Sequence, residues 1–304
     1  MSASSTQVLL VPYMDGAWAG FDPLSPEVGY SAPPFSLTEV TENMKAALQL
    51  MGELAGGRFV FGAHTGVYCR EPFYEEPLLG HYRELVEHGA EIAVHPHEEI
   101  VGEGTIVTST RHMRKIITEK TQQLRDAGIE PTSYRGGYCA YDPALTAILE
   151  EVGIDVDLSA APGQVNPQWS EEWADALPSA YYLCAEDPYH GACGHRKSGV
   201  LEIPMGWDGD GTSWAANYLN EDSTLDSMKR TWERILARAE ESGEQQIVYF
   251  MTHLFAVADA TLLSRCRGIL EHAAANGGRI VAPSEAKAAF DAQRVGETTS
   301  GGVE

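Results

Sequence analysis

The chain has 304 residues, of which 43% are hydrophobic, enough for one large α/β domain with a sizeable core. Asp and Glu total 44 against 21 Lys and Arg, which gives a formal net charge of -23. Because nucleic acids and anionic membrane surfaces would repel such a chain, the composition argues against both as partners.

The start of the chain and its cysteines bear on the compartment in which the protein works. Residues 1–6 are short and polar and lead straight into an apolar run at residues 8–11, with no basic leader and no run long enough to span a bilayer. The five cysteines are scattered and odd in number, which is typical of reduced thiols. These features predict a cytoplasmic protein.

Short apolar runs alternate with segments of helical periodicity along the chain. We expect strands at residues 7–13, 58–63, 91–95, 132–135, 154–158, 200–204, 247–252 and 279–282. We expect helices at residues 36–54, 78–88, 109–127, 142–152, 224–242, 258–275 and from residue 284 onwards. The alternation, without an internal repeat, predicts an α/β protein with a single (β/α) barrel or open sheet, right-handed throughout.

The same pattern bounds the domains. Residues 1–290 are expected to form one catalytic domain, interrupted by an irregular, aromatic-rich insertion at about 160–198. A stretch of that length inside a compact domain is usually functional or locally folded. The last residues, 291–304, are rich in Gly, Thr and Ser towards the end and are expected to be a disordered tail.

Five polar clusters each follow one of the strand-like runs. They lie at residues 13–16, 95–99, 134–138, 202–207 and 251–254. Because parallel strands present their carboxyl ends on one face, we expect these clusters to converge there. An aspartate, several histidines and an arginine on one rim are the parts of a metal-dependent hydrolase.

Several segments, taken in order, resemble the NodB-type polysaccharide deacetylases of carbohydrate esterase family 4. They are residues 89–95, 134–138, 153–157, 201–204, 252–253 and 278–285. The resemblance covers roughly residues 7 to 290 and implies a distorted (β/α)7 barrel of the polysaccharide deacetylase type. It also implies an enzyme that hydrolyses a C–N amide bond, usually by removing N-acetyl from an amino sugar.

The family holds one metal ion with an aspartate and two histidines. The resemblance makes Asp15 the carboxylate ligand, with a share in catalysis, and His95 the first histidine. The position of the second histidine holds Glu99, whereas His97 faces the same side as His95 if the segment is extended. We favour His97, because imidazole suits zinc, and keep Glu99 as the alternative. The implied ion is Zn²⁺, with Co²⁺, Ni²⁺ or Fe²⁺ as alternatives.

The resemblance also assigns proton chemistry. Arg135 would orient a carboxylate, and His253 would protonate the leaving amine. The position of the family's catalytic base holds Met14, which cannot take a proton. The candidates to replace it are Asp22, Glu98 and Glu99.

Three further residues are expected to contact substrate. Backbone N–H groups near Tyr138 would hold an oxyanion. His64 ends a strand on the same rim and either touches substrate, supplements the metal site or is structural. Trp207 and neighbouring aromatics suit a sugar ring. A second metal is not expected, because the spacing of a late Cys/His cluster is not that of a structural zinc site; its members are Cys184, His190, Cys193 and His195.

The expected partner is therefore a small molecule, an N-acylated amino sugar, and a homo-oligomer is left open. Two alternatives stay open at this point. One is a hydrolase of another C–N bond, such as a cyclic imide or ureide. The other is a sugar-binding barrel without turnover.

Overall fold

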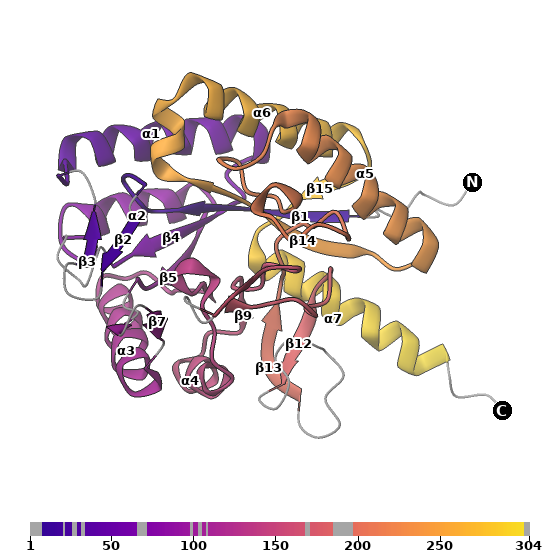
Figure 1. Ribbon diagram of the computed structural model, residues 1–304, viewed down its shortest axis with the longest axis horizontal. Helices are drawn as coiled ribbons and strands as arrows, with labels where there is room; N and C mark the ends of the chain where they lie inside the picture. The colour runs from indigo at the N-terminus through magenta and orange to yellow at the C-terminus, as the bar shows by residue number, and fades with distance from the viewer. Residues whose placement is uncertain are drawn as a thin grey trace.

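A single curled sheet organises the molecule (Figure 1). The computed structural model describes residues 8–20, 22–25, 29–31, 34–65, 72–97, 100–102, 105–107, 109–167, 171–184 and 197–300. Within these ranges, the strand order of the sheet is β12-β13-β9-β8-β5-β4-β1-β14. Their bounds are Tyr181–Cys184, Lys197–Glu202, Val156–Asp157, Ser133–Tyr134, Glu91–His95, Val60–His64, Val8–Asp15 and Gln246–His253.

The two edges of this sheet meet. All neighbours from β13 to β14 are parallel, and only β12 is antiparallel to its neighbour. Past the end of β13, the N–H of Gly206 donates to Tyr249 O, and the N–H of Tyr249 donates to Pro204 O, both at 2.9 Å. The sheet therefore curls until β13 meets β14, and the predicted (β/α)7 barrel fold is confirmed.

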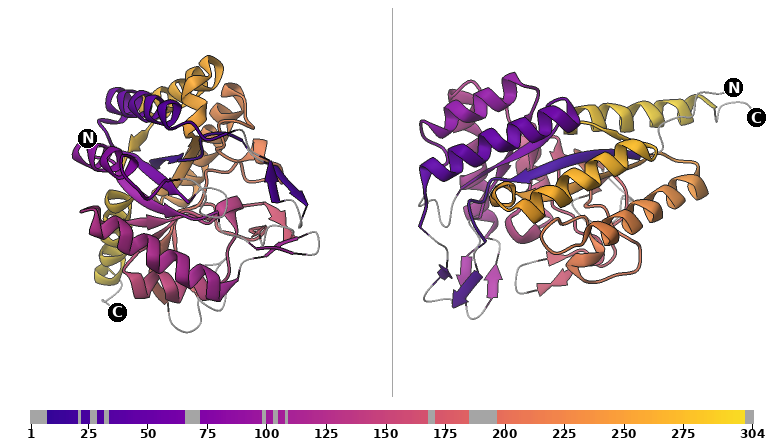
Figure 2. Two further views of the ribbon diagram at one scale, coloured as in Figure 1. Left: turned by 90° about the vertical axis from the view of Figure 1, so that its left-hand side faces the viewer. Right: turned by 90° about the horizontal axis from the view of Figure 1, so that it is seen from above.

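The helices pack outside the strands (Figure 2). Their bounds are α1 Leu37–Ala55, α2 Leu78–Glu87, α3 Thr110–Asp126, α4 Ala144–Val152, α5 Leu225–Ser242, α6 Ala260–Ala275 and α7 Pro283–Ser300. Their starts follow capping chemistry: the Ser36 hydroxyl accepts from the N–H of Glu39, and the Asp259 carboxylate accepts from the N–H of Thr261. The short strand β15 (Gly278–Ile280) adds to the start of β1.

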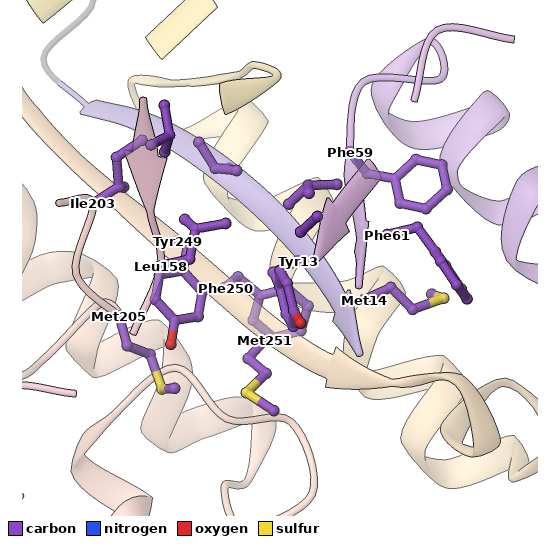
Figure 3. Packing of buried hydrophobic residues seen from close by; sticks show 14 of the residues in the cluster. Tyr13, Met14, Phe59, Phe61, Leu158, Ile203, Met205, Tyr249, Phe250 and Met251 are labelled. Atoms are coloured by element: carbon purple, nitrogen blue, oxygen red, sulfur yellow. The ribbon is translucent and has the colours of Figure 1, made fainter. Parts of the chain in front are cut away.

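The barrel strands are apolar on both faces, because helices cover the outside and side chains fill the inside. Every residue of β1 is buried, and β14 is buried as far as Thr252. Figure 3 shows Tyr13 and Tyr249 of this core, whose ring centroids lie 6.0 Å apart. This packing fixes the strands whose ends carry the polar clusters.

Short two-stranded hairpins follow three of the barrel strands. They are β2 (Asp22–Ser25) with β3 (Gly29–Ser31), β6 (Ile100–Gly102) with β7 (Thr105–Val107), and β10 (Val165–Asn166) with β11 (Glu171–Glu172). The insertion expected at 160–198 thus contains β10, β11 and β12 and the first residues of β13, so part of it is locally folded.

Two sequence expectations are wrong. Helix α7 continues to Ser300, so residues 291–300 are not a disordered tail; residues 301–304 lie outside the described ranges. Side-chain contacts hold this part of α7: Lys287 and Tyr182 both bond Asp291, and Gln293 donates to Gln245 at 2.8 Å.

Cys184 is disulfide-bonded rather than a reduced thiol. Disulfides are rare in the cytoplasm, so this bond does not support the predicted cytoplasmic location. That location stays a prediction.

None of the helices described is long and apolar enough to cross a membrane.

Candidate active site

The strand ends bring the sequence-predicted polar residues to one rim of the barrel. Asp15 ends β1 and pairs in register with His253, the last residue of β14. His64 ends β4 and pairs with His95, the last residue of β5. Arg135 directly follows β8. Residues that are distant in sequence therefore share one end of the barrel, as parallel strands require.

Asp15 is the centre of a buried charge cluster. Its Oδ2 lies 2.7 Å from His95 Nε2, 3.4 Å from Arg135 Nη1 and 3.9 Å from His253 Nε2. Its Oδ1 accepts from the backbone N–H of Ala17 at 2.9 Å. Burial alone would raise the pKa of Asp15, but His95 and His253 hold it well below its usual range. Asp15 is thus a carboxylate in the folded protein.

Three buried histidines lie beside this carboxylate. One ring nitrogen from each of His64, His95 and His97 lies within 4.8 Å of those of the other two. The rings of His64 and His97 stack at 4.5 Å, and the ring of His95 stands at right angles to that of His97 at 4.8 Å. Burial lowers the pKa of His64 to about 3 and that of His97 well below its usual range. Neutral imidazoles are the form that binds a divalent metal.

This group differs from the ligand set expected from the sequence. Among the described residues it is the one group of His, Cys, Asp or Glu arranged to hold a metal ion, and Asp15 is not part of it. Glu98 and Glu99, and three members of the late Cys/His cluster (His190, Cys193 and His195), lie outside the described residues, as does the side chain of Asp22.

His253 is held by a carboxylate that the sequence analysis missed. The Glu221 carboxylate lies 3.2 Å from His253 Nδ1 and accepts from the backbone N–H of His253 at 3.0 Å. It also accepts from the Thr252 hydroxyl at 3.1 Å. Burial alone would lower the pKa of His253, but Glu221, followed by Asp15, raises it above its usual value. No sequence signal links two residues 32 positions apart, because the loop that carries Glu221 has no periodicity.

A cavity of about 340 Å³ opens above these side chains. Asp15, Arg135 and His253 line it together with His97. Its other walls are partly apolar and partly acidic, formed by Trp214, Leu219, Met251, Phe255, Glu221 and Asp222. The cavity is therefore lined by groups able to donate a proton, bind an anion and pack against a flat apolar ring.

Of the three predicted substrate contacts, one lines the cavity. Tyr138 does, and its φ of 52° and ψ of 24° place it in the left-handed region, with its ring 5.0 Å from that of His97. A strained non-glycine residue at such a place is typical of functional sites. His64 is buried beneath the cavity, and Trp207 donates its indole N–H to Gly211 O at 2.7 Å instead of lining it. Trp214 is the tryptophan that lines the cavity.

No protein-family model matches the sequence, and no match is found among curated proteins. Several solved structures do match the fold of the chain. A candidate polysaccharide deacetylase from Mycobacterium smegmatis matches with a TM-score of 0.60 at 16% identity, over 97% of this chain and 94% of that one. A candidate polysaccharide deacetylase from Pseudomonas aeruginosa PAO1 matches with a TM-score of 0.58 at 13% identity, over 92% and 90%. PuuE allantoinase matches with a TM-score of 0.57 at 14% identity, over 93% and 90%.

The fold is that of the polysaccharide deacetylases. At these identities the likeness concerns the fold, and it agrees with the NodB-type resemblance found in the sequence. The chemistry has to be argued from the residues of this chain.

Proposed function

We propose that this protein is a metal-dependent hydrolase of a C–N amide bond, and that it removes an acetyl group from a small amino-sugar-containing substrate. The observation that carries the proposal is the meeting of Asp15, Arg135 and His253 at one cavity beside a group of three buried histidines. An acid, a carboxylate and a cluster of imidazoles at one cavity are the groups that metal-assisted hydrolysis requires.

The donor set fits a divalent metal ion. His64, His95 and His97 would hold it, because their nitrogens converge and all three side chains are buried. When bound, such an ion polarises a substrate carbonyl and lowers the pKa of a water molecule. We propose Zn²⁺ because an all-nitrogen donor set favours it over Mg²⁺ or Ca²⁺.

The chain's own residues supply the rest of the chemistry. His253, held by Glu221, carries the proton that the departing nitrogen needs. Arg135 lies 3.4 Å from the Asp15 carboxylate and balances its charge, and His95 contacts the same oxygen at 2.7 Å. Tyr138 lines the cavity next to His97, with the two rings 5.0 Å apart.

The cavity also bears on the substrate. At about 340 Å³ it is near the lower end, roughly 300 Å³, of small-molecule pockets, which suits a small substrate with a sugar-sized ring. Trp214 and Phe255 give it an aromatic lining of the kind that packs against sugar rings.

A second candidate is hydrolysis of a cyclic imide or ureide. It is favoured by Met14, which leaves no carboxylate at the family's base position, and by the likeness in fold to an allantoinase. A bond that is strained or activated would need less help from a base.

A panel of substrates separates these functions. The purified protein, loaded with Zn²⁺, is incubated with N-acetyl amino sugars and with cyclic ureides, and the products are followed by NMR. The proposal predicts free acetate and amine from the first class. Ring-opened product from the second class alone would establish the alternative, and no product from either class would contradict both.

A further inference from the structure

We propose that His64 takes the place of the aspartate in the metal site, so that His64, His95 and His97 bind Zn²⁺ or a similar ion and Asp15 is not a ligand. The inference rests on the proposed function and refines it, because it assigns the ligands of the same site. The NodB-type resemblance instead implies Asp15 as a ligand and assigns no role to His64.

The backbone explains why His64 reaches this place. β4 and β5 are adjacent and parallel, and His64 and His95 are register partners at their last residues, so both side chains leave the strands on the same face. His97 lies two residues further on, where the N–H of its backbone donates to Thr65 Oγ1 at 3.0 Å. This bond connects the residues that follow β5 and β4, and the His97 ring stacks on that of His64 and meets that of His95 edge-on.

The surroundings of His64 are those of a fixed ligand. Its ring is fully buried, with the ring of Phe73 at 5.5 Å and that of Trp18 at 6.1 Å. These aromatic neighbours restrict the orientation of the imidazole. A metal site requires such support for its first ligands.

His95 is oriented for ligation through one atom. Its Nδ1 lies 2.8 Å from the backbone carbonyl of Arg135, which can only accept, so Nδ1 carries the proton. Nε2 is then the donor atom available to a metal ion, and this hydrogen bond is the usual outer partner of a ligating histidine.

Asp15 is already engaged by other groups. Ala17 donates to one of its oxygens, and Arg135 balances its charge at the other. The second oxygen lies 2.7 Å from His95 Nε2, a contact that a bound ion would replace, and it does not belong to the three-histidine group. Removing its charge should therefore weaken ion binding no more than the loss of an outer partner does.

The test measures binding of Zn²⁺ and Co²⁺ to the full chain by titration calorimetry, together with the visible spectrum of bound Co²⁺. The variants are His64→Ala and Asp15→Asn, with His88→Ala as the matched control, because His88 is exposed and precedes the start of β5, whereas His95 ends that strand. His64→Ala should weaken binding by more than the roughly 10- to 100-fold that loss of an outer partner costs and should change the Co²⁺ spectrum. Asp15→Asn should stay within that range, and His88→Ala should bind like the wild type.

Loss of the ion in Asp15→Asn together with retention in His64→Ala would overturn the inference, as would a wild-type chain that binds neither ion. Circular dichroism checks the fold of each variant, and His64→Gln carries the same expectation should His64→Ala fail to fold. Because none of these readouts uses turnover, a wild type that hydrolyses amides while holding its ion through Asp15 would contradict the ligand assignment and leave the proposed function standing.

Discussion

At the scale of single residues, the pair His253 and Glu221 sets the pH range in which the proposed acid is protonated. Burial alone would lower the pKa of His253, and the Glu221 carboxylate more than offsets this. Activity that depends on protonated His253 is present below this pKa and is lost as the pH rises through it. The alkaline limb of kcat/KM should therefore reflect the raised pKa.

Glu221→Gln should move that alkaline limb to lower pH, because it removes the neighbouring opposite charge that raises the pKa of His253. The measurement is kcat/KM against pH for wild type and variant. Asp222→Asn, which removes the adjacent cavity carboxylate without a bond to His253, should shift the limb less. An unchanged limb in Glu221→Gln would show that Glu221 does not control this group.

His253→Ala should lower kcat by about 10²- to 10⁴-fold, the usual contribution of a positioned acid. Its side chain is 23% exposed and pairs with the Glu221 and Asp15 carboxylates, so its removal should also lower the thermal unfolding midpoint. Steady-state kinetics and thermal unfolding on the same preparation check both expectations. A variant with normal kcat would exclude His253 as the acid.

At the scale of elements, the end of β4 shows how tightly the site is built into the barrel. A Cβ added to Gly62 would lie 2.1 Å from the Tyr13 hydroxyl and 3.2 Å from His95 Cβ. Gly62→Ala should therefore destabilise the fold by about 1 to 3 kcal/mol, the cost of overpacking, and disturb His95. Gly20→Ala, which meets nothing within 4 Å, is the control. Urea unfolding measures both; equal stability of the two variants would contradict this packing account.

Elements with strong periodicity could be predicted from the sequence, and loops could not. The third expected strand, at 91–95, has the observed bounds of β5. A short apolar run between a glycine and a polar cluster is a strong sequence signal for a buried strand. The same logic anticipated that Asp15, His95, Arg135 and His253 would share a rim. Glu221 and Trp214 lie on a connection between elements, where only the tertiary fold decides which side chain enters the cavity. The helix beyond residue 290 depends on contacts with β12, which no local pattern encodes.

At the scale of the whole molecule, buried carboxyl groups link stability to pH. Burial raises the pKa of Glu171 to about 8, against a smaller opposite effect of Arg135, and raises that of Asp157 to about 6. Both groups bind a proton more tightly in the folded state. The contribution of these two groups to stability is therefore lost as the pH rises from the ordinary carboxyl range towards 8.

Glu171→Gln should remove part of this pH dependence, because a neutral amide of similar shape does not have to ionise in its buried place. The free energy of unfolding in urea at pH 5 and pH 8 should differ less in Glu171→Gln than in wild type, by on the order of a few kcal/mol. The neighbouring exposed Glu172→Gln is the control and should keep the wild-type difference. An undiminished difference in Glu171→Gln would locate the pH dependence elsewhere.

The claim that the whole account depends on is that water adds across a C–N bond in this cavity. Mass spectrometry of the products formed in ¹⁸O-labelled water tests it most directly. We predict that each turnover releases one amine and one carboxylate that carries a single ¹⁸O atom from the solvent, and that His253→Ala nearly abolishes both. Tight binding of the same substrates without labelled carboxylate, in the metal-loaded wild type, would contradict the account and indicate a binding barrel instead.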